Sequence, residues 1–424
     1  MRRQYVITGI DMGSQTIRVA VMGWSRGMEV PRLLSLVKRP AAGIKRGAVV
    51  DPDIAAQELR KALHEVKKTI GIRLDHAYLA QGEARMNMHV ARGTVAVARP
   101  DGEITAEDVR RVIASSEDAL PRFSNREILH TFPRFFHVDR DLFVHDPVSM
   151  NGMKLEVETL FVSTFAPHVR GLVRVAEAAG IMPDNVIASV LASAQVLLSK
   201  KHREIGCLLL DIGADVTNVS VWEEGKLYSF EVIPLGSGHI TQDIALAFQI
   251  DVDTAEKVKR AHASLMEDGS TPYEIRLAEF RTRHQSANGG SKHQEEHADE
   301  VISHRKLQEI VAARLSDIFE LADKHLKKVG RSELLPGGVV LAGGGARIGG
   351  LLALARRELR LPVEFCEAQT DLFEDPQRLF ADPLYHISIG AALWGIAEEQ
   401  KHRRSFFGQF IPRRLARLAQ AFIP

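Results

Sequence analysis

The sequence predicts an α/β protein built from two similar halves, and two hairpin-like stretches are the main reason. Residues 5–21 read as a strand, an Asp-x-Gly turn with a short polar tip and a second strand, and residues 205–222 repeat that order. Elsewhere, short apolar runs of strand length alternate with segments whose apolar residues recur at helical spacing, which is typical of α/β folds. We therefore expect two related domains, each carrying one hairpin, that face a common ligand.

Composition and charge exclude several classes of protein. Of the 424 residues, 55 are Lys or Arg and 54 are Asp or Glu. A general nucleic-acid binder would carry a large basic excess, so we expect no nucleic-acid partner. We also expect no membrane span and no secretion signal, because no long apolar run exists and the N-terminus leads straight into a strand. Cys207 and Cys366 lie in or beside apolar runs and are interpreted as core residues in a reducing compartment.

The elements expected in the first half follow from local patterns. Strands are predicted at residues 5–10, 17–23, 32–38 and 78–82. Asp51-Pro52-Asp53 should open a helix, because carboxylates complement the positive N-terminal end of the helix dipole.

Residues 84–162 differ in pattern from their surroundings. Thr105 and Asp108 have the spacing of a capping box and predict a helix start. Expected elements are this helix and strands at residues 90–98, 127–138 and 155–163. The interpretation is a small, strand-rich module with one helix, inserted between pieces of the first domain. The alternative is a continuation of the main sheet.

The second half is expected to be rich in helices. Helices are predicted at residues 167–180, 188–200, 240–248, from 253, 305–329, 349–359 and 387–398, with strands at 338–341 and 362–365. Residues 236–239 read as a tight turn, so that the helix after them would present an open N-terminus to an anion. Residues 266–304 are polar and poor in pattern, and Gly289-Gly290-Ser291 predicts a flexible point.

The chemistry of the two hairpins is that of phosphate binding. Gly and small polar residues at each tip let backbone amides approach a phosphate closely. Asp11 and Asp211 end the first strand of each hairpin and would hold Mg²⁺ through water, because Mg²⁺ keeps much of its hydration shell. Gly343-Gly344-Gly345 follows a third strand and would admit a base and a ribose. Each motif alone is a common turn, whereas their combination and order are far more specific.

That order resembles the actin/Hsp70/hexokinase superfamily, over nearly the whole chain. Its motifs would be a first phosphate motif at residues 9–17, a connecting helix at 188–200, a second phosphate motif at 208–218 and an adenosine motif at 338–346. Within the superfamily the chain is most similar to the bacterial FtsA family of cell-division proteins. The features that carry this resemblance are Leu191-Ala192-Ser193-Ala194, Val232-Ile233-Pro234 before Gly236, Asp253-x-Ala255-Glu256-x-Val258-Lys259, the insertion at 84–162 and an amphipathic tail.

The resemblance implies an actin-like (ribonuclease H-like), duplicated two-domain fold with an inserted α+β subdomain and a C-terminal amphipathic helix. The implied boundaries are 1–83 with 163–200 for the first large subdomain, 84–162 for the insertion, 201–240 with 330–400 for the second large subdomain, 241–329 for the second small one and 401–424 for a linker and membrane-targeting tail.

The resemblance also implies ATP and Mg²⁺ as cofactors and assigns residues to them. Asp11 and Asp211 would position Mg²⁺ and the phosphates. The implied nucleotide-binding residues are Gly13, Ser14, Gln15, Gly213, Thr217, Gly236, Gly238, Glu256, Lys259, Gly343, Gly344, Gly345 and Arg347. Without the resemblance, Glu256 and Lys259 could equally form a surface ion pair on one helix.

One departure from the superfamily affects the expected activity. Hsp70-like members carry a Glu at the start of the connecting helix that orients the attacking water, and the matching position here is Ser189. Gln195 is the nearest alternative, and the second tip reads Gly-Ala-Asp instead of Gly-Gly-Gly. We therefore expect ATP binding with at most slow hydrolysis.

The last residues form a basic, aromatic-rich segment whose pattern favours a membrane interface. The membrane-binding candidates are Phe406, Phe407, Phe410, Ile411, Arg413, Arg414, Leu415, Arg417, Leu418 and Phe422. Such cations favour anionic lipids. The alternative is a terminal helix docked on the protein or on a partner.

The resemblance implies a peripheral protein on the cytoplasmic side of the inner membrane, at the division septum. It would polymerise, tether the FtsZ ring by holding the FtsZ C-terminal tail in residues 241–329, and recruit later division proteins. Alternatives are another actin-like cytoskeletal or pilus-assembly scaffold and, with less support, a sugar kinase or an Hsp70-type ATPase. A kinase needs a catalytic carboxylate that we do not identify, and a chaperone needs a substrate-binding domain in place of the short tail.

Overall fold

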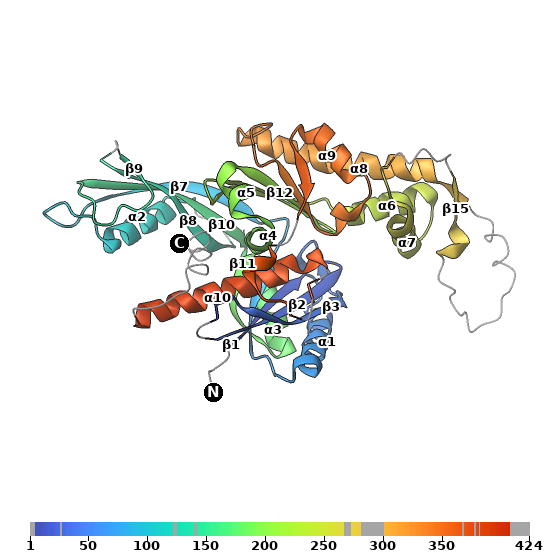
Figure 1. Cartoon of the computed structure of the whole chain (residues 1–424), viewed down its shortest axis with the longest axis horizontal. Coiled ribbons are helices and arrows are strands. Elements are labelled where there is room, and N and C mark those ends of the chain that lie inside the picture. Colours follow the sequence, from blue (N-terminus) through green and yellow to red (C-terminus); the bar gives the residue numbers. More distant parts are fainter. Residues whose placement is uncertain are drawn as a thin grey trace. The chain divides into compact units, whose positions relative to one another are not determined.

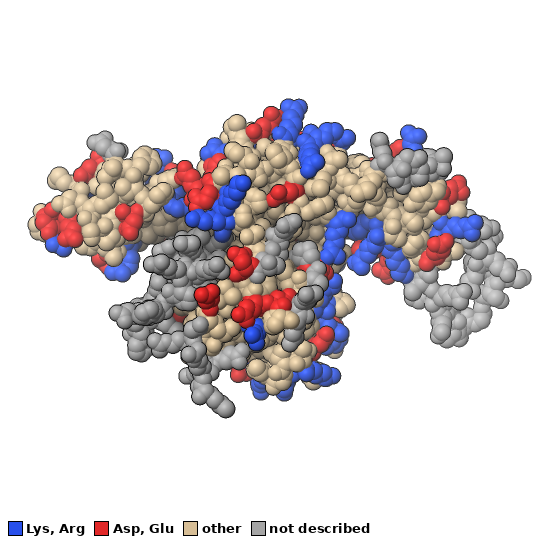
Figure 2. All heavy atoms as spheres, viewed as in Figure 1, with Lys and Arg blue, Asp and Glu red and all other residues tan. Residues whose placement is uncertain are grey.

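The computed structural model describes residues 5–25, 28–121, 125–139, 142–266, 273–280, 301–366, 369–376, 379–380 and 382–407. The chain forms two compact units (Figure 1). Unit 1 comprises Met1–Glu204, Ser220–Val232 and Glu367–Pro424, and unit 2 comprises Ile205–Val219 and Ile233–Cys366. Within the described residues, every helix is too short or too polar to cross a bilayer. Basic and acidic side chains are interspersed on the face shown in Figure 2.

A five-stranded sheet forms the centre of unit 1, in the order β11-β6-β1-β2-β3. Its strands are β1 (Tyr5–Met12), β2 (Thr16–Trp24), β3 (Arg32–Pro40), β6 (His76–Gln81) and β11 (Met182–Ala188). The first predicted hairpin is confirmed, since β1 runs antiparallel to β2 with Asp11 opposite Arg18. A short ribbon of β4 (Ile44–Lys45) and β5 (Ala48–Val49) precedes the first helix.

Helices cover both faces of this sheet (Figure 1). They are α1 (Pro52–Ile70), α3 (Ala166–Ala179), α4 (Ser189–Leu197) and α10 (His386–Phe407), while the short α5 (Lys200–Ile205) hydrogen-bonds to the turn at Glu224 and Gly225. Ile10 of β1 shares a core with Leu59 of α1 and Val175 of α3. On the other face, a Cβ added to Gly9 would lie 2.0 Å from the backbone oxygen of Ser388 in α10. Successive strand residues point to opposite faces of a sheet, so Ile10 packs against α1 and α3 on one face and Gly9 lies against α10 on the other.

Local signals in the sequence explain where these helices begin and how closely they pack. Asp51 caps α1 as predicted, with its Oδ1 accepting a hydrogen bond from the Ile54 amide at 3.1 Å. Gly390 lets α10 contact α4, since a Cβ there would lie 2.0 Å from the Ala192 backbone oxygen.

The inserted module has a sheet of its own in the order β7-β10-β8-β9, covered by one helix. Its elements are β7 (Asn87–Ala96), α2 (Ala106–Asp118), β8 (Arg126–Val138), β9 (Leu142–Val144) and β10 (Lys154–Phe165). Val112 of α2 packs with Phe136 and Leu155 of the sheet. The separate sheet and core confirm an inserted module and exclude a continuation of the main sheet.

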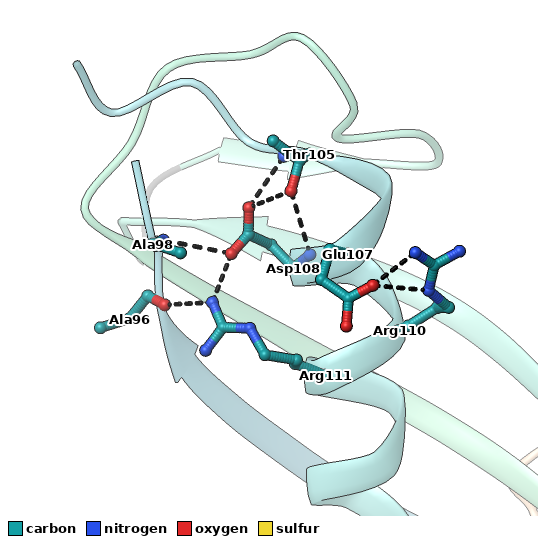
Figure 3. Close-up of polar contacts among 7 residues, drawn as sticks. All are labelled: Ala96, Ala98, Thr105, Glu107, Asp108, Arg110 and Arg111. Carbon is teal, nitrogen blue, oxygen red and sulfur yellow. Dashed lines mark hydrogen bonds and ion pairs between the residues drawn. The ribbon is translucent and has the colours of Figure 1, made fainter. Parts of the chain in front are cut away.

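The predicted capping box starts α2, as Figure 3 shows. The Asp108 carboxylate accepts hydrogen bonds from the backbone and hydroxyl of Thr105, from the Ala98 amide and from Arg111. Burial alone would raise the pKa of Asp108, but these four donors hold the pKa well below its usual range. Thus one buried carboxylate joins α2 to the end of β7.

A second five-stranded sheet has the order β14-β13-β12-β17-β18. Its strands are β12 (Cys207–Ile212), β13 (Thr217–Glu223), β14 (Lys226–Ile233), β17 (Val339–Ala342) and β18 (Val363–Phe365). Of these strands β12, β17 and β18 belong to unit 2, together with α6 (Ser237–Phe248), α7 (Val252–His262), β15 (Glu274–Arg276), β16 (Val301–Ser303), α8 (His304–Lys328), the 3-10 turn η2 (Gly344–Arg347) and α9 (Leu351–Leu359). The helix predicted at residues 305–329 is confirmed as α8, and its Leu307, Val311 and Leu315 are fully buried along one face.

Three expectations differ from the structure. The predicted helix 188–200 is divided into α4 and α5, and the predicted turn at 236–239 includes the first turn of α6. The stretch 266–304, expected to lack pattern, contributes β15 and β16, which pair with each other. Each difference concerns a short element whose conformation depends on packing more than on local pattern.

The subdomain boundaries remain predictions, and residues 408–424 of the predicted membrane-targeting tail lie outside the described residues. The sequence placed 387–398 with the second large subdomain, whereas in the structure α10, which contains this segment, belongs to unit 1.

Candidate functional site

The tip of the first hairpin is closed by a backbone hydrogen bond from the Gly13 amide to the Thr16 carbonyl, at 3.0 Å. Asp11 ends β1 just before this turn, and only 7% of it is exposed. Its Oδ2 accepts a hydrogen bond from Nη1 of Arg18 at 2.9 Å. The hairpin therefore presents a buried carboxylate and a guanidinium together.

Arg18 is a residue that the sequence analysis missed. Its Nε is buried and has no hydrogen-bond partner among the residues that the structure describes. A guanidinium with a donor left over beside a glycine-containing turn suits a phosphate oxygen. The signal was present in the sequence, because residues equally distant from a hairpin turn face each other across the two strands.

The rest of the first tip is tied to its neighbours. The Ser14 hydroxyl accepts a hydrogen bond from the Gly47 amide at 3.2 Å, and the Gln15 carbonyl accepts one from the Ala41 amide at 2.9 Å. These bonds use one lone pair of Ser14 and the backbone of Gln15. The Ser14 hydroxyl proton and the exposed Gln15 side chain can still face a ligand.

The second hairpin repeats the geometry of the first. The Gly213 amide donates to the Val216 carbonyl at 2.9 Å, and Asp211 is buried at the end of β12. Gly343 packs directly against it, because an added Cβ would lie 2.4 Å from Oδ1 of Asp211 and from the Ile212 carbonyl. The structure thus brings the predicted second phosphate motif and the predicted adenosine motif into contact within unit 2.

The start of α6 also contacts this hairpin. The Ser237 amide donates to the Gly213 carbonyl at 2.9 Å, and the Gly238 amide donates to the Ala214 carbonyl at 2.7 Å. A Cβ on Gly236 would lie 2.6 Å from the Ala214 oxygen. The open helix N-terminus expected from the sequence is therefore partly engaged, since its first two amides hold the hairpin tip.

The Thr217 side chain also links the second hairpin to the segment before α6. Its hydroxyl donates to the Leu235 carbonyl at 2.7 Å, which connects β13 to the loop before α6. By contrast, Gly344 and Arg347 lie on η2 and are exposed.

Glu256 and Lys259 form an ion pair beside α6 in which Lys259 is buried and Glu256 is partly exposed. Lys259 is 8% exposed, and its Nζ lies 2.7 Å from Oε2 of Glu256, 2.9 Å from the Ser237 carbonyl and 2.7 Å from the Thr241 hydroxyl. These three contacts match the three donors of an ammonium group. The pair therefore connects α7 to the same helix turn that holds the second hairpin.

The pKa values of this pair follow from its surroundings. Burial lowers the pKa of Lys259, although the hydrogen bond from its ammonium to Glu256 opposes that shift. Burial alone would raise the pKa of Glu256, but hydrogen bonds from Lys259 and Thr241 bring it below its usual value. The carboxylate is consequently charged near neutral pH.

Asn218 is a second residue that the sequence analysis missed. It follows Asp211 at the same spacing as Arg18 follows Asp11. Asn218 is 8% exposed, and its Oδ1 has no hydrogen-bond partner in the described part of the chain. A buried amide without a partner beside a predicted phosphate motif indicates that water or a ligand completes the contact.

Ser189, the position at which the resemblance leads us to expect a Glu in Hsp70-like proteins, begins the buried helix α4. Every residue of α4 is buried, and a Cβ on Gly82 would lie 2.2 Å from the Ser189 hydroxyl oxygen. Gln195 is equally buried, at 2% exposure.

The residues present suit a metal ion held through water molecules better than one coordinated directly by several side chains. Among the described residues, no cluster of three or more His, Cys, Asp or Glu side chains could hold a metal ion. Asp11 and Asp211 each supply one buried carboxylate, in unit 1 and unit 2 respectively. Mg²⁺ commonly uses one or two carboxylates together with water and phosphate oxygens.

Comparisons with known proteins agree with the arrangement of motifs. The family profile described as "Cell division protein FtsA" matches residues 208–390, and the profile "SHS2 domain inserted in FTSA" matches residues 84–163. The second match coincides with the inserted module. Together the profiles cover the second hairpin, the glycine stretch and the insertion.

Curated relatives align with most of the chain. "Cell division protein FtsA" of Bacillus subtilis is 29% identical over 378 residues, which are 89% of this chain and 82% of the relative. The proteins of the same name from Pseudomonas aeruginosa and Escherichia coli K12 are each 25% identical, over 400 and 420 residues. These alignments cover 93% and 96% of this chain, and 90% and 96% of the relatives.

Solved structures of similar fold include actin-like proteins. The "PilM-PilN type IV pilus biogenesis complex" has a TM-score of 0.64 at 18% identity, covering 92% of this chain and 98% of that chain. MreB5 of Spiroplasma citri bound to ADP has a TM-score of 0.52 at 13% identity, covering 95% of this chain and 98% of that chain. At such identities the likeness shows the fold alone. The solved structures show an actin-like fold, and the two family profiles together with the relatives that align with most of the chain show that it belongs to the FtsA family of cell-division proteins.

Proposed function

We propose that this cell-division protein binds ATP, assembles into filaments, attaches the FtsZ ring to the cytoplasmic face of the inner membrane at the septum and recruits later division proteins. The observation that carries the proposal is the matched pair of hairpins. Each places a buried Asp before a turn that is closed by the same backbone hydrogen bond, Gly13 to Thr16 and Gly213 to Val216.

The chain's own residues would divide the work of holding the nucleotide. Arg18, Ser14 and the amides of the first tip would contact phosphate oxygens from unit 1. In unit 2, Asp211 and Asn218 would contact the phosphates or their bound water, and the glycines at 343–345 would lie along the adenosine. Mg²⁺, held through water by Asp11 and Asp211, would neutralise phosphate charge.

Slow hydrolysis follows from the connecting helix. Water attack on a phosphate needs a group that orients the water. Ser189 packs against Gly82 and bears no carboxylate, so it is a poor group for that task. The nucleotide would then act chiefly as a switch between arrangements of the protein that differ in their tendency to assemble.

The FtsZ tail would bind the small subdomain within residues 241–329. Several large apolar side chains there face solvent, among them Leu246 on α6 at 81% exposure and Val252 on α7 at 56%. Exposed apolar side chains on neighbouring helices are typical of peptide-docking surfaces. Leu246→Lys should weaken FtsZ-tail binding, whereas Ile72→Lys, at an exposed site in unit 1, should not.

Membrane attachment would depend on the C-terminal segment. Its arginines and aromatic residues suit the interface of an anionic bilayer, with each cation contributing about 1 kcal/mol near the surface. A peripheral location agrees with the finding that the described helices are unsuited to cross a bilayer.

One experiment tests ATP-dependent assembly and membrane attachment together. Full-length protein is applied with ATP to an anionic lipid monolayer and imaged by electron microscopy, beside a chain that lacks residues 408–424 but keeps α10. We expect lipid-bound filaments for the full chain and none for the shortened chain. Filaments without ATP, or equal lipid binding by both chains, would contradict the proposal.

A further inference from the structure

Two connections join the inserted module to the main sheet of unit 1, and a buried glutamate lies between them. The first connection is residues 82–86, between β6 and β7, and the second is residues 163–168, where β10 ends and α3 begins. Glu83, in the first connection, is 1% exposed. A carboxylate so deeply buried needs hydrogen-bond donors to offset its lost hydration.

The donors to Glu83 come from both connections. Its Oε1 accepts hydrogen bonds from the Thr164 hydroxyl at 2.5 Å and from the Phe165 amide at 3.4 Å. Its Oε2 accepts one from the Arg85 amide at 3.1 Å and lies 2.8 Å from Nδ1 of His168. Because a carboxylate only accepts hydrogen bonds, this His168 nitrogen carries the proton. One side chain therefore fastens the two connections to each other.

Arg126, at the start of β8, fastens the same connections a second time. Its Nη2 donates to the carbonyl oxygens of Arg85 at 2.9 Å and Ser163 at 3.0 Å, and its Nε donates to the Ser163 hydroxyl at 3.1 Å. Burial lowers the pKa of Arg126, and the charge of Glu83 opposes that shift. We call the two connections, with Glu83 and Arg126, the junction.

The junction also touches the turn that supports the first hairpin tip. The Gly47 amide, between β4 and β5, donates to the Ser14 hydroxyl at 3.2 Å. A Cβ on Gly47 would lie 1.9 Å from the Gly82 carbonyl oxygen and 3.1 Å from Cα of Glu83. Interiors packed this closely transmit displacements. A single turn therefore lies between Ser14, a proposed phosphate contact, and the buried carboxylate of the junction.

We propose that the junction couples the first hairpin tip to the inserted module, so that nucleotide bound at the tip tightens the hold of Glu83 on both connections. A phosphate that fixes Ser14 would fix the Gly47 turn, and the fixed turn would restrict the backbone at Gly82 and Glu83. Glu83 is thus a positioning residue. The inference rests on the nucleotide binding proposed above. Because coupling is reciprocal, loosening the junction should also weaken nucleotide binding.

Amide hydrogen exchange of the full chain, followed by mass spectrometry with and without ATP and Mg²⁺, reads the junction directly. Isothermal titration measures binding in the same samples. We expect ATP to slow exchange in residues 82–86 and 163–168 at least about twofold. ATP binding without any slowing there would overturn the coupling and leave the proposed nucleotide site in place. Absence of ATP binding would overturn both.

Glu83→Gln loosens the junction and leaves the tip residues unchanged. An amide has one acceptor oxygen, so two of the four donors around Glu83 would lose their acceptor. We expect faster exchange in both connections, no slowing by ATP and an ATP affinity about two- to tenfold lower. Glu107→Gln, which removes an exposed carboxylate on α2 of the same module, should behave like the parent protein. Parent-like exchange and affinity in Glu83→Gln would overturn the proposal.

Gly47→Ala tests the turn between the tip and the junction. Gly71→Ala is the matched control, because the two glycines have φ of 73° and 70° but no atom lies within 4 Å of a Cβ added at position 71. At saturating ATP, exchange in both connections should respond to the nucleotide in Gly71→Ala and not in Gly47→Ala. A response that persists in folded Gly47→Ala would overturn the coupling through this turn. Circular dichroism checks folding, and the Glu83→Gln comparison decides by itself if Gly47→Ala does not fold.

Discussion

Gly343 contacts Asp211 so closely that no larger residue could take its place. A Cβ at position 343 would lie 2.4 Å from Oδ1 of Asp211, and the backbone there has φ 85°, a conformation that favours glycine. This contact joins two motifs that are distant in the sequence. It makes the geometry of the second hairpin depend on the turn after β17.

Gly343→Ala should therefore destabilise the protein by roughly 3–5 kcal/mol, combining backbone strain with steric overlap. Gly330→Ala is the matched control, because Gly330 also has a positive φ of 70° but has no atom within 4 Å of an added Cβ. Its expected cost is about 1 kcal/mol. Urea denaturation of both variants checks the difference, and equal losses of stability would contradict the steric argument.

Arg18→Met should weaken nucleotide binding by about tenfold or more. The substitution removes a guanidinium proposed to contact phosphate, and it also removes the ion pair between Arg18 and the Asp11 carboxylate. Arg18→Lys should keep the charge but not the planar geometry, and should lose less affinity. Isothermal titration with ATP and Mg²⁺ measures both. Affinity equal to the parent protein in Arg18→Met would place this arginine outside the nucleotide site.

Glu256 should make the protein more sensitive to acid. Its pKa in the folded state lies below its usual value of 4.5, so the unfolded chain binds the proton more readily. The stability that this carboxylate contributes is present above pH 4.5 and is lost as the pH falls through the folded-state pKa. Unfolding by urea between pH 3 and pH 6 should show a smaller loss for Glu256→Gln than for the parent protein. Parallel pH profiles would refute this assignment.

Asp108→Asn should destabilise the inserted module by about 1–2 kcal/mol, because it weakens the capping box of α2. The carboxylate serves Thr105, Ala98 and Arg111 at once, as Figure 3 shows. Glu107→Gln is the control, since Glu107 pairs with Arg110 on the exposed side of the same helix. Exposed pairs contribute little, so that variant should stay within about 0.5 kcal/mol of the parent. Thermal unfolding compares the two.

Features that depend on neighbouring residues were predictable from the sequence. The cap of α1 by Asp51 and the capping box at Thr105 rest on hydrogen bonds within one helical turn. The hairpins with Asp11 and Asp211 combine two β-rich runs with a turn that glycine makes possible. The inserted module was recognisable because its strand pattern differs from that of its flanks.

Features that depend on distant residues were not predictable in the same way. The sequence suggested either a nucleotide contact or a surface ion pair for Lys259, and the structure shows it buried against Ser237 and Thr241 of another helix. The α6 N-terminus looked open in the sequence, but its amides hold the tip of the second hairpin. Among the described residues, the Nε of Arg18 and the Oδ1 of Asn218 have no hydrogen-bond partner, and only the tertiary structure reveals this.

The sequence by itself determined the two hairpins and the starts of α1 and α2, because hydrophobic periodicity, capping and turn chemistry act over a few residues, and its motifs carried the resemblance to the family. Tertiary structure alone decided which charged groups are buried, which glycines must remain glycine and that α10 packs on the sheet of unit 1. The physical reason is that desolvation and steric exclusion depend on atoms brought together from distant positions, and a single strand or helix does not specify its neighbours.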